Sequence, residues 1–225
     1  MSIEDNIKPS APCAAKFSVR SILMSKTKAS VGRPRSFDEN EALRKALDVF
    51  WEKGYDGTSL SDLTEAMGIN KPSLYATFGN KDQLFLKAIE MYENRPCQFF
   101  YPALEEKTVE SVAQKILYGA AASFTDRSHP QGCVIVQGAL SCSETAAQVK
   151  EALMNKRKEG EIKLRERLEC AQSHGDLPSD ANTAALARYI GTVIQGMAVQ
   201  ANNGATEQEL IEVADLALKA IPAHE

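Results

Sequence analysis

The clearest chemistry in this sequence lies on one side of a short segment between Lys71 and Phe78. If that segment is a helix with Leu74 and Phe78 turned inward, the helical period turns the other side chains outward together. The outward set contains an amine, hydroxyls and a phenol, and it contains no acid: Lys71, Ser73, Tyr75, Ala76 and Thr77. Such groups suit phosphates and base edges, and the Ala76 methyl suits a thymine methyl. We therefore predict a helix that binds nucleic acid.

Two short helices joined by a glycine turn are predicted to hold this face in place. Ser59 can cap the first helix, with Asp62 at the reciprocal capping position. Gly68 can end that helix in a left-handed conformation, and Asn70 can cap the second helix. A helix, a glycine turn and a second helix form the unit that enters a major groove. Composition alone leaves open an ordinary helical hairpin with a solvated face.

Anchors to the phosphate backbone are expected on both sides of this unit. Thr58 and Ser59 lie at the start of the first helix, where hydroxyls can meet phosphate. Lys81 opens the next helix, which Asn80 caps, so an ammonium and free backbone amides face the same way. The basic segment 26–35 includes Arg33 and Arg35, which suit a minor groove or phosphates unless the segment is a solvated tail.

The run from Thr58-Ser59-Leu60 through Ala66-Met67-Gly68-Ile69 to Leu74-Tyr75-x-x-Phe78-x-x-Lys81 resembles the DNA-binding domain of the tetracycline-repressor (TetR) family of bacterial transcription regulators. The resemblance is strong over about residues 36–95 and implies a homodimer that binds operator DNA. It also implies that the helix at about 80–95 is a lever moved by ligand binding, and that the last two helices form half of an intersubunit bundle. Many family members carry a Gly-Arg-Pro segment like the one at Gly32.

Charge and composition favour the same class of protein. The 225 residues carry a net charge of −4, yet residues 1–36 hold seven Lys or Arg against two Asp or Glu. A basic arm on an acidic body is compatible with DNA binding. The five cysteines are scattered without a C-x-x-C pair, and the sequence has three histidines and neither a Gly-rich phosphate loop nor an H-E-x-x-H motif. We predict no catalysis, cofactor or metal, and a cytoplasmic protein without a membrane span.

Hydrophobic periodicity predicts an all-α fold. We expect a disordered extension and basic arm at 1–35, a three-helix helix-turn-helix domain at 36–80, and a helical effector-binding and dimerisation domain at 81–225. The expected helices are 38–53, ending at Gly54, then 80–95, 108–125, 145–173, 180–203 and 207–221, with a loop at 97–107. Segment 133–140 fits a buried helix or a strand. Charged residues of the long helix 145–173, Arg157 and Arg167 among them, are predicted to be solvated.

A small-molecule effector is expected between facing helices of the C-terminal part, with a hydrophobic compound as the default. The candidate wall residues are Tyr92, Phe99, Phe100, Tyr101, Tyr118, Phe124, Cys133, Gln137, Met154 and Gln195. A thiol-based redox or electrophile sensor, or a metal-responsive one, is an alternative because Cys133 and Cys142 flank the buried segment and His129 lies nearby.

The last two helices are candidates for a dimer interface, with packing inside the chain as the alternative. The first is rich in glycine and alanine, which suggests close helix approach. The candidate residues are Ala187, Gly191, Ile194, Gly196, Leu210, Val213, Leu216 and Ala217. The resulting hypothesis is a homodimeric regulator, most simply a repressor, that binds a pseudo-palindromic operator and is released by an effector. A DNA-binding adaptor with a protein partner is the remaining alternative.

Overall fold

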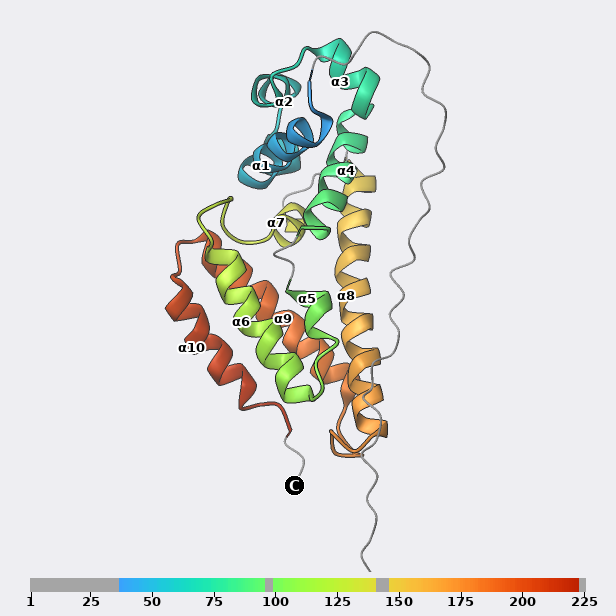
Figure 1. The fold of residues 1–225 in the computed structure, drawn as a ribbon, viewed down its shortest axis with the longest axis vertical. Coiled ribbons are helices and arrows are strands. Elements are labelled where there is room, and N and C mark those ends of the chain that lie inside the picture. Colours follow the sequence, from blue (N-terminus) through green and yellow to red (C-terminus); the bar gives the residue numbers. More distant parts are fainter. Residues whose placement is uncertain (1–36, 96–98, 141–145, 223–225) are drawn as a thin grey trace, which may run out of the picture.

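A computed structural model describes residues 37–95, 99–140 and 146–222, and these ranges contain helices joined by turns and no strand (Figure 1). The all-α prediction is confirmed. The helices are α1 (Glu39–Gly57), α2 (Leu60–Met67), α3 (Lys71–Phe78), α4 (Lys81–Glu93), α5 (Phe100–Ala103), α6 (Val109–Thr125), α7 (Val134–Leu140), α8 (Ala147–Ser173), α9 (Thr183–Asn202) and α10 (Glu207–Leu218).

Local signals place the first helices where the sequence predicts them. The Asp38 carboxylate caps α1 by accepting from the amides of Asn40 and Glu41. Gly54 lies within α1 with φ of 70°, so the regular helix is interrupted at the predicted residue and the chain turns there. Leu47 and Phe50 on the inner side of α1 are 0% and 1% exposed.

The predicted caps around the turn are confirmed. Ser59 and Asp62 form a reciprocal capping box at the start of α2, and Gly68 ends α2 with φ of 68° and ψ of 30°. The Asn70 side chain accepts from the Ser73 amide at the start of α3. Asn80 and Gln83 form a second capping box at the start of α4. These caps fix the entry angles of α2, α3 and α4.

Helix α4 connects α1–α3 to the rest of the molecule. It runs down from α3 beside the upper part of α8 (Figure 1) and packs on both α1 and α8. Phe85 on α4 lies edge-on to Phe50 of α1 with ring centroids 5.0 Å apart. The hydrophobic core that contains this pair continues without a break to Leu117 on α6 and Met197 on α9. The helix-turn-helix unit is therefore packed onto the C-terminal helices.

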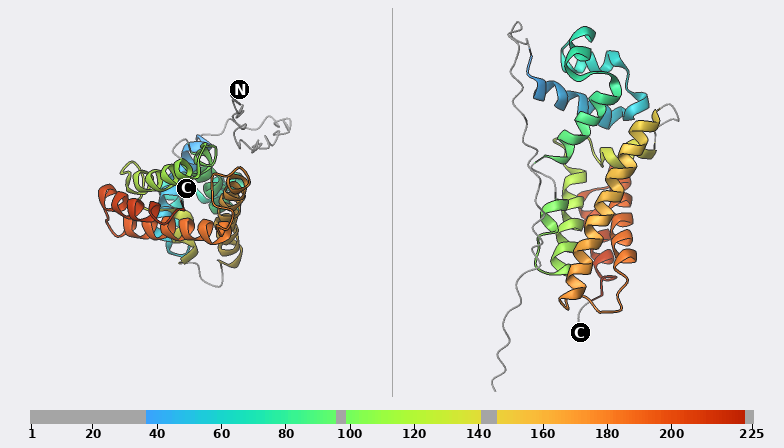
Figure 2. Two further views of the ribbon diagram at one scale, coloured as in Figure 1. Left: turned by 90° about the horizontal axis from the view of Figure 1, so that it is seen from below. Right: turned by 90° about the vertical axis from the view of Figure 1, so that its right-hand side faces the viewer.

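The C-terminal part is a bundle in which α6 packs on α9 and α10, and α8 packs on α9 (Figure 2). A second apolar cluster at the end farther from α1 joins Val112 and Ile116 of α6, Leu164 and Leu168 of α8 and Ile190 of α9.

Three features of this part correct or complete the sequence analysis. The segment that fits either a helix or a strand forms helix α7, and the four-residue α5 was not predicted. The prediction that Arg167 is solvated is wrong, because the residue is 2% exposed. Its guanidinium donates to the carbonyls of Leu104, Glu106 and Lys107 at 3.0, 2.7 and 3.2 Å, and so holds the loop before α6 against α8.

Among the described residues, no helix combines the length and apolar character that crossing a membrane requires.

Candidate nucleic-acid interface and ligand pocket

Helix α3 presents the polar face that the sequence predicts. Leu74 and Phe78 are 0% and 4% exposed, so they fix the inward side of the helix. Lys71, Tyr75 and Ala76 are exposed, and Ser73 and Thr77 are half-buried. Tyr75 is 49% exposed, an unusual position for a large aromatic side chain. The outward face of α3 carries one ammonium and no carboxylate, which is the character that phosphate binding requires.

The expected anchors differ in their geometry. Ser59 is exposed at the start of α2, where its hydroxyl accepts from the Asp62 amide. Lys81 lies at the start of α4, with its ammonium 4.2 Å from the centre of the Tyr55 ring. Tyr55 in turn donates a hydrogen bond to Asp82. The ring therefore steadies the Lys81 side chain near the α4 amides.

Thr58 does not fit its expected role. It is 2% exposed, and its hydroxyl donates to the Gly54 carbonyl at 2.6 Å. The hydroxyl is used to close the turn between α1 and α2 and does not point to solvent. Arg33 and Arg35 lie outside the described residues.

Two contacts that the sequence analysis missed hold α2 and α3 in position. The Lys53 ammonium of α1 lies 2.6 Å from the Asp62 carboxylate of α2. The Lys87 ammonium of α4 donates to the Thr77 carbonyl at 3.2 Å, in the last turn of α3. Both pairs join residues nine or ten positions apart in different helices. A periodic pattern within one helix therefore cannot predict them.

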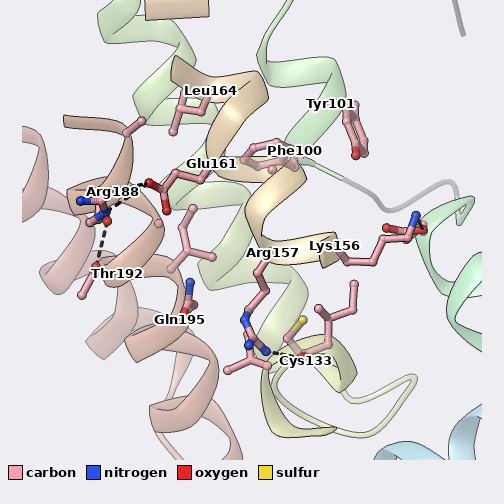
Figure 3. A pocket seen from close by; sticks show the side chains of 17 residues that line it. Phe100, Tyr101, Cys133, Lys156, Arg157, Glu161, Leu164, Arg188, Thr192 and Gln195 are labelled. Carbon is pink, nitrogen blue, oxygen red and sulfur yellow. Dashed lines mark hydrogen bonds and ion pairs between the residues drawn. The ribbon is translucent and has the colours of Figure 1, made fainter. Parts of the chain in front are cut away.

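A pocket of about 320 Å³ opens between α4, α5, α7, α8 and α9 (Figure 3). Four of the predicted wall residues line it: Phe100, Tyr101, Cys133 and Gln195. Ala187, Gly191 and Ile194 also line it, although they were predicted to lie in a dimer interface. Burial raises the pKa of the Tyr101 hydroxyl, so that group is a neutral donor at neutral pH.

The other predicted wall residues lie elsewhere. Tyr92 stands behind the wall, where its hydroxyl donates to Cys133 Sγ at 3.4 Å. Phe99 packs on Phe124 with ring centroids 5.7 Å apart. The remaining three make separate contacts or face outward: Tyr118 donates to Asp215 at 2.7 Å, Gln137 donates to the Gln131 carbonyl at 3.2 Å, and Met154 is 38% exposed.

The predicted dimer residues also divide. Leu210 and Ala217 are 1% and 3% exposed inside the chain's own core, so they do not face a partner. Val213 and Leu216 of α10 are 41% and 66% exposed. A Cβ added to Gly191 or Gly196 of α9 would meet no atom within 4 Å. Close helix approach within the chain therefore does not explain these two glycines.

Charged residues of the pocket wall were missed. Glu93, Lys156, Arg157, Glu161 and Arg188 all line the pocket. The only sequence signal is the charged run of α8, which predicts a solvated face. Their position becomes visible only when α8 is packed beside α4 and α9.

Cys133 is a free, buried cysteine at the pocket wall. Burial raises the pKa of its thiol above the ordinary value, and this outweighs the opposing effects of the Tyr92 hydroxyl, nearby amides and Arg157. Within the ranges that the structure describes, no group of three His, Cys, Asp or Glu side chains is placed to hold a metal ion.

An exposed, acid-free second helix on a capped helix-turn-helix, joined by α4 to a helical bundle with an internal pocket, defines a class of DNA-binding transcription regulator. Comparison with known proteins gives the family. The family model described as bacterial regulatory proteins of the tetR family matches residues 42–88, and the one described as tetracyclin repressor-like, C-terminal domain, matches residues 114–214.

Whole-chain relatives agree with these matches. The HTH-type transcriptional repressor ComR of Escherichia coli K12 is 34% identical over 200 residues, which cover 87% of this chain and 94% of that protein. The HTH-type transcriptional repressor BdcR of the same organism is 27% identical over 191 residues, covering 84% and 92% of the two chains. The chain belongs to the TetR family.

A solved structure of the TetR family regulator CifR, a cysteine mutant complexed with a 26-bp double-strand operator DNA, has a similar fold. The TM-score is 0.82 at 38% sequence identity, and the match covers 85% of this chain and all of that one.

Proposed function

We propose that this TetR-family regulator is a homodimeric repressor, which binds a pseudo-palindromic operator through α3 and leaves it when a small molecule fills the pocket. The observation that carries the proposal is the outward face of α3, with Lys71, Tyr75 and Ala76 exposed and no acid among them. The repressor names of ComR and BdcR and the operator complex of CifR support it. Residues 36–80 are assigned to DNA binding, and residues 81–225 to the effector and the dimer.

Within this proposal, Lys71, Ser73, Tyr75, Ala76 and Thr77 meet bases and phosphates. Ser59, Lys81, Arg33 and Arg35 are assigned to the phosphates and the adjacent minor groove. A two-fold dimer would place its recognition helices about 34–36 Å apart, one helical turn of DNA. Thr58 supports the turn and is not assigned a DNA contact.

Helix α4 provides the proposed route from pocket to DNA. It begins at Lys81, next to α3, and its last residue Glu93 lines the pocket. Glu93 accepts from Lys156 of α8 at 2.8 Å, so movement at the pocket reaches α4 directly. A ligand shifts the equilibrium only if it binds the DNA-bound and released arrangements with different affinity.

The proposal is tested by gel shift with DNA flanking the protein's own gene and with a random-sequence selection, each with and without candidate ligands. Tyr75→Ala and Lys81→Ala should weaken binding while leaving the melting temperature near that of the wild type. Loss of the Lys81 phosphate contact should also reduce the salt dependence by about one counterion. Lys219→Ala, an exposed lysine at the far end of α10, is the matched control.

Absence of binding at low salt in both DNA experiments would contradict the proposal. The helix-turn-helix would then serve as scaffold, and the adaptor with a protein partner would become the better hypothesis. A covalent thiol mechanism is a weaker second candidate. Cys133 lines the pocket, but burial disfavours the thiolate that such a mechanism needs.

A further inference from the structure

The charges around the pocket do not balance. Among the residues that the structure describes, the wall carries three basic side chains, Lys156, Arg157 and Arg188, and two acidic ones, Glu93 and Glu161. Lys156 pairs with Glu93 at 2.8 Å, and Arg188 pairs with Glu161 at 2.9 Å. One positive charge is left over, and it is that of Arg157.

Arg157 has little within the protein to offset its charge. Its Nη1 donates to the Ile135 carbonyl at 3.2 Å, and this neutral acceptor is the only hydrogen-bond partner it has among the described residues. No carboxylate in the described ranges lies within ion-pair distance of it. The side chain extends from α8 toward Cys133 (Figure 3). The guanidinium carries five donor hydrogens, so most of them have no acceptor in the described part of the protein.

Neighbouring groups in the described part of the chain do not supply the missing negative charge. Burial raises the pKa of the Cys133 thiol, which is therefore neutral at neutral pH. Burial also lowers the pKa of Arg157, the direction expected when a guanidinium loses water without gaining an anion. An anionic ligand would reverse that penalty, and its carboxylate could accept two parallel N–H bonds from the guanidinium.

The rest of the pocket is suited to an apolar body. Phe100, Leu164 and Ile194 line it from α5, α8 and α9, and Gly160 and Gly191 leave room between them. A Cβ on Gly191 would meet no atom within 4 Å. The site thus combines one unpaired cation with apolar walls.

We propose that the effector is a small organic acid whose carboxylate binds Arg157 and whose apolar body packs against Phe100, Leu164 and Ile194. This inference rests on the proposed function, in which the pocket is the effector site. It replaces the purely hydrophobic compound expected from the sequence with an amphipathic anion.

The test compares acids with their neutral amides on the full-length protein. Phenylacetate and octanoate are paired with phenylacetamide and octanamide, and binding is measured by melting shift and by calorimetry. At least one acid should bind about tenfold or more tightly than its amide, because a hydrogen bond from the guanidinium to a charged carboxylate is stronger than one to a neutral amide. Equal binding of the acids and the amides, or no binding by either acid, overturns the inference.

Variants of Arg157 test whether this residue causes the preference for acids over amides. Arg157→Gln should abolish the preference for the acid, and Arg157→Lys should keep part of it. Lys158→Gln should keep it fully, since Lys158 is the exposed neighbour on α8 and does not line the pocket. A preference that survives in Arg157→Gln overturns the assignment.

If Arg157→Gln does not fold, the assignment of Arg157 is tested by NMR on the wild-type protein. The Arg157 Nε signal, assigned by its absence in Arg157→Lys, should shift in NMR spectra with the acid and not with the amide. An unmoved signal overturns the assignment.

Failure of this inference is distinguishable from failure of the proposed function. Release from operator DNA by a neutral compound bound in the pocket would keep the repressor proposal and reject the acid. Preferential acid binding without any effect on operator affinity would keep the ligand class and reject its effector role.

Discussion

The Tyr92 hydroxyl of α4 donates a hydrogen bond to Cys133 Sγ at the pocket wall, with O and S atoms 3.4 Å apart. The same tyrosine ring meets Trp51 of α1 edge-on, with ring centroids 4.9 Å apart, and the His129 ring stacks on Trp51 with centroids 4.7 Å apart. The pocket wall is thereby in contact with the first helix of the DNA-binding unit through two side chains. Trp51, the single tryptophan, reports on this junction.

Cys133 is expected to react slowly with thiol reagents. Its raised pKa keeps the thiol protonated. The rate of iodoacetamide alkylation should therefore rise only at a higher pH than in an unfolded chain, where the pKa of a cysteine thiol has its ordinary value of 9.0. The Tyr92 bond opposes this shift, so Tyr92→Phe should slow the reaction further. Mass spectrometry of the Cys133 peptide, in native and urea-unfolded protein, measures both rates.

Tyr118→Phe is the control for that experiment, since its hydroxyl donates to Asp215 on α10 and not to a thiol. Alkylation of native Cys133 as fast as in urea would contradict the protected thiol and would favour the thiol-sensor alternative.

Arg167→Met should lower the free energy of unfolding by about 3 kcal/mol, because three loop carbonyls lose a charged donor while remaining near the protein interior. Urea denaturation measures the change. Arg165→Met, two residues earlier, removes an exposed pair with Glu169 and should cost less than about 1 kcal/mol. Similar costs for both variants would contradict the buried role of Arg167.

Asp62 is expected to give a pH-dependent contribution to stability. The Lys53 ammonium and the Ser59 cap hold the pKa of its carboxyl far below the ordinary 3.8. Because the carboxyl pKa is lower in the folded state, the ionised carboxylate stabilises the protein at pH values above the pKa of the unfolded chain. This contribution is lost progressively as the pH falls below that unfolded-state pKa toward the folded-state pKa. The melting-temperature difference between wild type and Asp62→Asn should therefore shrink from about pH 6 to about pH 3. A difference that stays constant would rule out the charged interaction.

Leu216→Arg should convert the protein from dimer to monomer and weaken operator binding. Leu216 and Val213 are exposed apolar residues on α10, and Val199 on α9 is 36% exposed. A charge buried between two such surfaces would lack a partner. Sedimentation measures the assembly state, and Met154→Arg on α8 is the control with a similar change in charge. An unchanged dimer would move the interface away from α10.

Local features of this fold are predictable from the sequence, and features that depend on packing are not. The caps at Ser59, Asn70 and Asn80 are short-range hydrogen bonds between residues three positions apart, so the sequence pattern contains them. Adjacent residues Lys156 and Arg157 look alike in the sequence. They separate only in the folded chain, where one meets Glu93 and the other meets a carbonyl of α7.

The same distinction explains the errors at the sites. Thr58 looks like a phosphate ligand until the Gly54 turn brings a carbonyl to its hydroxyl. Helix α5 has four residues and includes Pro102, which is too short for a periodic signal. Some residues of α9 line the pocket and others pack in the core. The sequence alone does not separate these two roles from a dimer interface, because alanine or glycine is present in each of the three candidate sets.

Gly191 gives this architecture a capacity for change. Glycine within a helix costs about 1 kcal/mol of helix stability relative to alanine. At Gly191 no neighbouring atom would clash with an added methyl group. Substitution by a larger residue would make α9 more stable and the cavity smaller at the same time. Ligand range can therefore evolve at this position by single substitutions that strengthen the scaffold, leaving the operator-reading surface as it is.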